Sequence, residues 1–254
     1  MFSLASKKAV VTGGGSGIGR AISVLFAKQG AEVHIIELSG ENAAATVQEI
    51  TAAGGKATAH SCNVADQAEV LATFEKIGPL HILVNNAGIA HIGKADTTSE
   101  EDFDRVIKVN VKGVYNCLYA AIPQLRAAKG GVIVNMASIA AWVGLSDRFV
   151  YSTAKGAVMA MTLSVAKDYI QENIRCNSVS PARVHTPFVD GFLKNNYPGR
   201  EAEMFEKLSK TQPIGRMAEP TEVGALILYL CSDEAAFITG CDYPIDGGFI
   251  KLNS

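Results

Sequence analysis

Cysteine and histidine are scarce in this chain, and neither is spaced as in a metal site or a disulfide framework. The five cysteines are odd in number, lie far apart and include no Cys-x-x-Cys pair, and the five histidines are equally dispersed. Metal sites built from these ligands need short, regular spacings. We therefore expect no metal, and reduced thiols as in a cytoplasmic protein.

The chain also lacks an excess of charge of either sign. Lysine and arginine together number 23 against 25 aspartates and glutamates, which gives a formal net charge of -2 over 254 residues. Proteins that bind nucleic acid through its phosphates carry a basic surplus on the binding surface. We therefore do not expect nucleic acid as a partner.

Long hydrophobic runs are missing as well. The longest candidates, such as Val223 to Cys231, are shorter than a bilayer span and are typical of core helices. The first residues, Met1 to Lys8, have no charged segment followed by an apolar one, so we expect no secretory signal and no membrane partner. Hydrophobic residues still make up 48% of the chain, which is enough for a substantial core.

Short β-branched runs alternate with longer amphipathic stretches. Turn signals bound expected strands at Ala9–Thr12, Val33–Ile36, His81–Val84, Val132–Asn135 and Ile174–Val179, with weaker candidates at Lys56–Ser61 and Asp242–Ile245. Expected helices lie between them, at Gly17–Gln29, Gly40–Ala53, Ala65–Lys76, Ser99–Ala127, Tyr151–Gln171 and Pro220–Cys231. This alternation predicts one α/β domain over residues 1–254, with a doubly wound parallel sheet and helices on both faces.

One segment breaks this rhythm. Residues Pro181 to Pro213 have irregular polarity and contain Pro187, Gly191 and Pro198. A long excursion after a late strand of a doubly wound sheet is a candidate lid over the site. We expect a lid at about 182–213, and a surface insertion without function is the alternative.

A glycine-rich turn follows the first expected strand and opens the first expected helix. Glycines allow positive φ and a close approach of backbone to ligand, and a helix N-terminus attracts a pyrophosphate. The spacing is Gly-x-x-x-Gly-x-Gly rather than the commoner Gly-x-Gly-x-x-Gly. The candidate cofactor-binding residues in this turn are Gly13, Gly15, Ser16, Gly17, Ile18 and Gly19.

An acidic residue, Glu37, stands at the end of the second expected strand. A carboxylate about 20 positions after such a turn can bond the adenosine ribose hydroxyls, and its charge repels a 2′-phosphate. The neighbours Leu38 and Ser39 offer no cation for that phosphate. We therefore predict NAD as cofactor, although a solvated glutamate at a strand end is the alternative.

Tyr151 and Lys155 lie four residues apart, so on a helix they share one face. A lysine ammonium beside a phenol lowers the phenol pKa from its reference of about 10, toward the range of a general acid or base. Most such pairs are solvated helix faces. Here Ser138 and the glycine-rich turn stand upstream, which favours a catalytic role.

Taken together, these residues resemble the short-chain dehydrogenase/reductase family over nearly the whole chain. The resemblance rests on Thr12-Gly13-x-x-x-Gly17-x-Gly19, Asn85-Asn86-Ala87-Gly88, Asn110, Ser138, Tyr151-x-x-x-Lys155 and a late Pro181-x-x-x-x-Thr186-Pro187. It implies a Rossmann-like fold and the catalytic set Asn110, Ser138, Tyr151 and Lys155. In that set the tyrosine exchanges a proton with substrate, the serine binds the same oxygen, the lysine holds the nicotinamide ribose, and the asparagine anchors a water.

The resemblance also implies further cofactor-lining residues: Asn63, Val64, Asn86, Ala87, Gly88, Pro181, Val184 and Thr186. Two departures from the family pattern concern this site. Asn63 replaces the usual aspartate before Val64 but can still bond an adenine edge. Ala182 replaces a glycine after Pro181 and adds a methyl group near the nicotinamide.

The substrate is less clearly indicated. Arg148 and Arg183 lie close in sequence to catalytic residues, and arginine binds carboxylates bidentately. We therefore expect a secondary alcohol or ketone on an acidic substrate, such as a sugar acid or keto acid, although both arginines could instead form surface salt bridges. The alternatives are a 3-oxoacyl-thioester reductase and a non-catalytic nucleotide-binding scaffold. By resemblance we expect a homotetramer.

Overall fold

The computed structural model describes residues 1–252, apart from the side chain of residue 196. The strands of this described part form one parallel sheet in the order β3-β2-β1-β4-β5-β6-β7. Their bounds are β1 (Lys8–Thr12), β2 (Glu32–Glu37), β3 (Lys56–Ser61), β4 (Ile82–Asn85), β5 (Gly131–Met136), β6 (Ile174–Pro181) and β7 (Asp242–Ile245). The predicted doubly wound sheet is confirmed, including both weak strand candidates.

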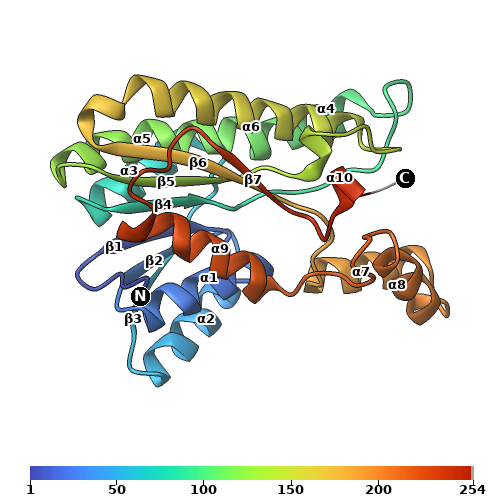
Figure 1. Cartoon of the computed structure of the whole chain (residues 1–254), viewed down its shortest axis with the longest axis horizontal. Helices are drawn as coiled ribbons and strands as arrows, with labels where there is room; N and C mark the ends of the chain where they lie inside the picture. Colours follow the sequence, from blue (N-terminus) through green and yellow to red (C-terminus); the bar gives the residue numbers. More distant parts are fainter. Residues whose placement is uncertain (253–254) are drawn as a thin grey trace.

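Helices cover both faces of the sheet (Figure 1). On one face lie α1 (Gly17–Lys28), α2 (Gly40–Ala52) and α9 (Pro220–Cys231), and on the other lie α3 (Gln67–Ile77), α5 (Gly113–Ala127) and α6 (Phe149–Asp168). The remaining helices are α4 (Glu100–Ile107), α7 (Pro187–Asn196), α8 (Glu201–Ser209) and α10 (Phe249–Leu252). Figure 1 shows α7 and α8 together, projecting from one end of the layers.

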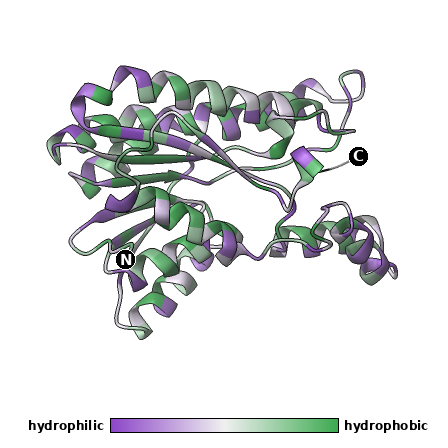
Figure 2. Ribbon diagram, viewed as in Figure 1, coloured by the Kyte–Doolittle hydropathy of each residue, from purple (hydrophilic) through white to green (hydrophobic). Residues whose placement is uncertain are grey.

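The two faces of the sheet have separate apolar cores because strand side chains alternate in direction. In β1, Ala9 and Val11 pack with Phe26 of α1, whereas Val10 packs with Phe74 of α3. All five side chains are almost completely buried. The central strands β1 and β4 are accordingly almost wholly apolar, and the hydropathy colouring shows the middle of the sheet mainly in green (Figure 2).

The helix α6 is long and apolar enough, by length and composition, to meet the criteria for a membrane span. The expectation that no run in the chain reaches this length was therefore wrong. Val150, Ala154 and Val158 of α6 are nevertheless fully buried inside the protein, and α6 packs against β5 and β6. These contacts are those of a core helix.

Two segments differ from their sequence-based description. The helix expected over Ser99–Ala127 is divided into α4 and α5 by a π-helical turn at Lys108–Lys112. The irregular stretch expected as a lid contains α7 and α8, which begin at Pro187 and Glu201. Neither was predicted because both are short, and α7 also contains the turn-forming residue Gly191.

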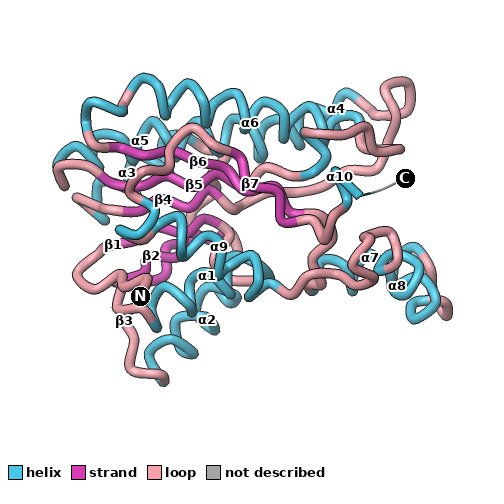
Figure 3. Tube along the Cα trace, in the orientation of Figure 1, coloured by secondary structure: helices cyan, strands magenta, loops and turns pink. Residues whose placement is uncertain are grey.

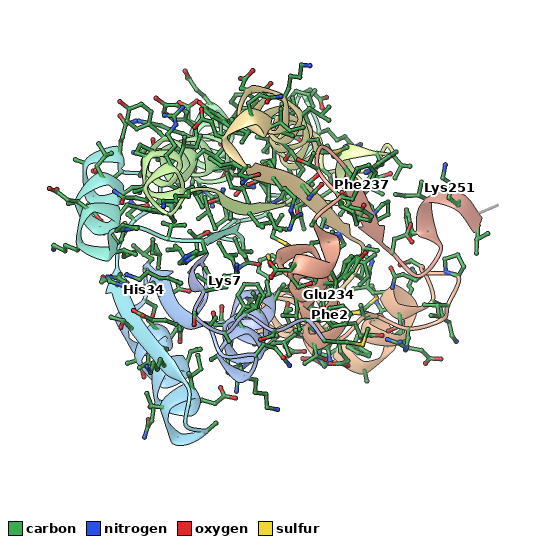
Figure 4. The ribbon with its side chains drawn as sticks, turned by 60° about the vertical axis from the view of Figure 1, so that its left-hand side comes forward. Phe2, Lys7, His34, Glu234, Phe237 and Lys251 are labelled. Carbon is green, nitrogen blue, oxygen red and sulfur yellow. The ribbon has the colours of Figure 1, made fainter. Side chains whose placement is uncertain are left out.

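The loops at the carboxyl ends of the strands gather at one end of the sheet (Figure 3). Successive strands run outward from β1 to β3, and the chain then crosses to β4 on the other side of β1. In such sheets ligands bind at this switch point. The amino terminus does not take part in this site. The Phe2 amide instead donates to the Glu234 carboxylate, in the turn after α9, at 2.8 Å (Figure 4).

Candidate active site

A cavity of about 720 Å³ follows the carboxyl ends of β1, β2, β4, β5 and β6. It passes from Glu37 at the end of β2, past the glycine-rich turn at the switch point, to Tyr151 on α6. Most of the predicted site residues line it: Gly13, Ser16, Gly17, Ile18, Glu37, Asn63, Val64, Asn86, Ala87, Gly88, Ser138, Arg148, Tyr151, Lys155, Pro181, Arg183, Val184 and Thr186.

Three predicted residues, Gly15, Gly19 and Asn110, lie outside this lining. Gly19 is a packing position, because a Cβ atom there would lie 2.0 Å from the carbonyl oxygen of Gly13. Gly15 instead uses its amide to bind the Glu37 carboxylate at 3.1 Å. Gly15 and Gly19 therefore set the shape of the turn, while Gly13, Ser16 and Gly17 form its surface toward the cavity.

Asn86 ties β1 to β4 at the switch point. Its side-chain amide donates to the carbonyl oxygens of Thr12 at 3.0 Å and Gly13 at 3.2 Å. In return, the Thr12 hydroxyl accepts from the backbone amides of Asn86 and Ala87, both at 3.0 Å. This cross-link holds Ala87 and Gly88 against the cavity, which is the role that the family resemblance implied for the turn.

Two helix N-termini border the same cavity. Ser16 and Thr186 cap α1 and α7 with extended backbone, and neither side chain makes a capping bond to its own helix. The two ends are close, since a Cβ atom on Gly17 would lie 3.3 Å from the Thr186 side chain. Unpaired N–H groups and the helix dipoles favour an anion at this place.

These features suit a nicotinamide dinucleotide. Glu37 offers a carboxylate for ribose hydroxyls, and the capping residues Ser16 and Thr186 mark the amide donors for a pyrophosphate. Val184 is held by a parallel bridge to Ala218, with the Ala218 amide donating to the Arg183 carbonyl at 3.0 Å. The far end of the cavity then reaches the catalytic side chains.

Tyr151 and Lys155 lie one turn apart on α6, as predicted. The Lys155 ammonium donates to the Met136 carbonyl at 2.6 Å and lies 5.8 Å from the centroid of the Tyr151 ring. Ser138 follows β5 and begins a short 3-10 turn, where its hydroxyl accepts from the Ala140 amide at 3.2 Å. The end of β5 thus places Ser138 and the lysine anchor beside the tyrosine.

Burial dominates the titration of this pair. It lowers the pKa of Lys155 to about 8. It also raises the pKa of Tyr151, against opposing effects of a hydrogen bond with Ser138 and the positive charge of Arg148. The sequence predicts a lowered tyrosine pKa, and the structure differs because desolvation of the phenolate outweighs the neighbouring charges.

Asn110 sits in the π-helical turn, and its side chain is almost completely buried. Its amide donates to the Ile89 carbonyl at 2.8 Å, while its carbonyl oxygen accepts from the Ile89 amide at 2.8 Å. This two-way bond fastens the loop after β4 to the helix behind the active site. π-Helical turns occur frequently at functional sites, and the sequence signal for this one was an asparagine in mid-helix.

Arg148 and Arg183 both line the catalytic end of the cavity. Within residues 1–252, neither guanidinium forms an ion pair, so the alternative of two surface salt bridges does not hold for the described residues. Arg148 donates to the Asp147 carbonyl at 3.1 Å, and Arg183 donates through Nε to the Thr211 hydroxyl at 3.1 Å.

Sequence reasoning missed several lining residues that carry no chemical signature. They are Ile36, Leu38, Cys62, Ile89, Ala90, Val109, Met136, Ala137, Ile139, Leu145, Ser146, Pro187, Phe188, Val189, Gln212 and Phe249. Most are apolar residues adjacent to a strand end or a predicted site residue. Proximity to those positions was the available signal, whereas Gln212 and Phe249 reach the cavity only through the tertiary fold.

The chain is similar in sequence to known oxidoreductases over nearly its whole length. A family model described as enoyl-(acyl carrier protein) reductase matches residues 13–250. Cyclohexanol dehydrogenase of Acinetobacter sp. is 39% identical over 251 residues, which cover 96% of this chain and 95% of that protein. The 3-oxoacyl-(acyl-carrier-protein) reductase of Thermotoga maritima is 36% identical over 251 residues, which cover 97% of this chain and 99% of that protein.

A solved structure is similar over the whole fold. L-sorbose reductase from Gluconobacter frateurii, in a crystal structure with NADPH and L-sorbose, gives a TM-score of 0.94 at 28% identity and covers 99% of both chains. The chain belongs to the short-chain dehydrogenase/reductase family and is an oxidoreductase of that type. The resemblance predicted from the sequence motifs is therefore confirmed.

Proposed function

We propose that the protein is an NAD-dependent dehydrogenase that interconverts a secondary alcohol and a ketone on a small acidic substrate. The observation that carries the proposal is one cavity with Ser138, Tyr151 and Lys155 at one end and the Glu37 carboxylate at the other. General acid–base chemistry beside a nicotinamide site is the reaction that this arrangement supports.

The proposed oxidation uses the cofactor for the hydride and protein side chains for the proton and for charge stabilisation. NAD, when bound, supplies the acceptor for the hydride that leaves the carbinol carbon. Tyr151, as the phenolate, takes the hydroxyl proton and becomes the phenol, so that the substrate loses a hydride and a proton and becomes a ketone. Ser138 binds the same substrate oxygen and stabilises its developing negative charge. Lys155, anchored on the Met136 carbonyl, supports the phenolate form with its positive charge.

The preference for NAD rests on Glu37. Its two carboxylate oxygens accept from the amides of Gly15 at 3.1 Å and Leu38 at 2.9 Å, and the residue lines the cavity. A fixed negative charge at this position opposes a 2′-phosphate. L-sorbose reductase was solved with NADPH, so the preference proposed here depends on this residue and not on the family.

An acidic substrate is supported by Arg148 and Arg183, which line the catalytic end of the cavity and form no ion pair with the described part of the chain. The second candidate is reduction of a 3-oxoacyl thioester, which the similarity to the Thermotoga maritima reductase favours. The two functions are separated by initial rates on hydroxy acids with NAD and on acetoacetyl thioesters with NADH and NADPH. If only the thioesters are turned over, the protein is a 3-oxoacyl-thioester reductase and the proposal of an acidic substrate is wrong.

The variant Tyr151→Phe tests catalysis itself. Removal of the phenol oxygen is expected to lower kcat by about 10²- to 10⁴-fold, while NADH binding, followed by fluorescence, stays close to that of the unchanged protein. Tyr229→Phe, on a half-buried side chain of α9 outside both the cavity and the proposed interface, is the matched control. Undiminished turnover in Tyr151→Phe would contradict the proposal and favour a non-catalytic scaffold.

We also propose that the protein is a homotetramer, assembled through α5, α6 and the C-terminal segment. Tyr119 on α5 and Leu163 on α6 are 55% and 59% exposed, and no described residue after Tyr243 is fully buried. Sedimentation equilibrium tests this assembly, with a mass near four times the 26.8 kDa of one chain expected. A monomer mass would contradict it.

A further inference from the structure

A second cavity of about 370 Å³ adjoins the catalytic one. Ala90, Arg148, Arg183, Phe188 and Val189 line both cavities, so the two arginines stand at their junction. The first cavity already holds the residues for hydride and proton transfer. The second is therefore additional space that a substrate can reach from the catalytic tyrosine.

The junction carries positive charge that no carboxylate among residues 1–252 neutralises. Arg183 is half-buried and fixed through Nε on Thr211, while its neighbour Arg148 begins α6. Burial and the charge of Arg148 both lower the pKa of Arg183. No carboxylate of the described residues is in ion-pair distance of either side chain. An anion placed here would relieve this repulsion and form charge-assisted bonds.

Beyond the junction the second cavity is apolar. Ile92 and Phe188 line it with 47% and 63% of their surfaces exposed, and Met217, which also lines it, is buried. His91 is the other polar residue in the lining, but its Nδ1 lies 3.6 Å from the Asp102 carboxylate on α4. Such walls offer little to the hydroxyl groups of a sugar acid, whereas an alkyl or aryl group would cover exposed apolar surface.

We propose that the substrate is a hydroxy or keto acid with an apolar substituent: its carboxylate binds between Arg148 and Arg183, and its alkyl or aryl group occupies the second cavity. This inference rests on the proposed function for the position of the reacting carbon. It replaces the sugar acid of the sequence-based expectation by an aliphatic or aromatic acid.

Turnover with NAD provides the first test, with two pairs of substrates that differ only in chain length. Each buried methylene is worth about a threefold to fourfold increase in affinity. We expect kcat/KM for 3-hydroxyhexanoate and 2-hydroxyhexanoate to exceed that for 3-hydroxybutyrate and lactate by at least about tenfold, and to exceed that for gluconate. The inference would be overturned if kcat/KM for gluconate equalled that for the hexanoates, or if the long and short acids had equal kcat/KM.

The matched variants are Phe188→Ser and Phe237→Ser. Both replace an exposed phenylalanine, but Phe188 lines the second cavity and Phe237 points away from the protein surface, fully exposed (Figure 4). Phe188→Ser should reduce the preference for long over short acids by about tenfold, whereas Phe237→Ser should leave it unchanged. Equal ratios in both variants would count against the second cavity as the subsite.

Binding to the NADH-loaded protein keeps the inference testable without turnover. Calorimetry with hexanoate, butyrate and hexanamide should give the tightest binding for hexanoate, by at least about tenfold over each of the other two. Arg183→Met should remove the advantage over hexanamide, with Arg20→Met on α1 as control. If hexanoate binds no better than butyrate or hexanamide, the inference fails. If it binds as expected but no alcohol is oxidised, the proposed function fails instead.

Discussion

The carboxylate of Glu37 accepts a hydrogen bond from the amide of Gly15 at 3.1 Å, so the end of β2 is joined directly to the glycine-rich turn after β1. The second carboxylate oxygen accepts from the Leu38 amide at 2.9 Å. These bonds hold the negative charge at the edge of the cavity. A fixed charge discriminates between ligands more strongly than a mobile one, because little of its effect is lost to rotation or solvation.

Glu37→Gln should weaken the discrimination against NADP. The amide keeps an acceptor for Gly15 but loses the charge, which isolates the electrostatic part of the preference. A hydrogen bond to a charged group contributes about 1.5–3 kcal/mol, so the ratio of kcat/KM for NAD over NADP should fall about 10- to 100-fold. Glu75→Gln, exposed on α3, is the control. An unchanged ratio would show that another group sets the preference.

Gly19 and Gly40 should respond in opposite ways to alanine. A Cβ atom on Gly19 would lie 2.0 Å from the Gly13 carbonyl oxygen, whereas one on Gly40 would meet nothing within 4 Å. Gly19→Ala should therefore lower the free energy of unfolding by about 3 kcal/mol. Gly40→Ala, at the start of α2, should raise it by about 0.4–1 kcal/mol. Urea unfolding of both variants gives the comparison, and similar stability would contradict the packing described here.

Oxidation and reduction should depend differently on pH. Burial raises the pKa of Tyr151, so the phenol stays protonated at neutral pH and becomes a base only in alkaline solution. Because oxidation needs the phenolate and reduction needs the phenol, kcat/KM for oxidation should rise from pH 7 to 10 without reaching a plateau, while kcat/KM for reduction should stay nearly constant over this range. Initial rates in both directions test this. A flat profile for oxidation would mean that Tyr151 does not take the proton.

Much of the fold followed from local sequence signals. Strands such as β1 are apolar and β-branched because both faces are covered, and Gly17 marks the start of α1 by its place after a strand. Even β3 and β7, which have mixed polarity, were found at their observed bounds. The helices α7 and α8 were not, because short helices on an outlying segment lack the long apolar stripe that reveals a buried one.

The site was predictable where residue type dictates chemistry. Tyr151, Lys155 and Ser138 could be named because few other roles require that combination at that spacing. The π-turn around Asn110 and the second cavity depend instead on tertiary packing. The sequence showed an asparagine in mid-helix but not the shape of the turn, and no local pattern predicted the cavity. The raised pKa of Tyr151 was missed for the same reason, since the sequence shows the neighbouring charges but not the burial that outweighs them.

The burial of Lys155 should be visible as a pH-dependent stability. Its pKa falls from 10.5, the value for an exposed lysine, to about 8 in the folded protein. Below the folded pKa the protein holds a desolvated charge. As the pH rises from about 8 toward 10.5, the folded state gives up this proton before the unfolded state does. Stability therefore increases across this window, by about 3 kcal/mol at most.

Lys155→Met removes the titrating group and should remove this rise. Compared with the variant, the unchanged protein should gain stability between pH 8 and 10.5, as measured by urea unfolding at several pH values. Lys167→Met, at the exposed end of the same helix, should follow the unchanged protein. Parallel curves for the unchanged protein and Lys155→Met would mean that Lys155 keeps its ordinary pKa. The lysine would then be charged throughout the neutral range and would stabilise the Tyr151 phenolate more strongly than its burial implies.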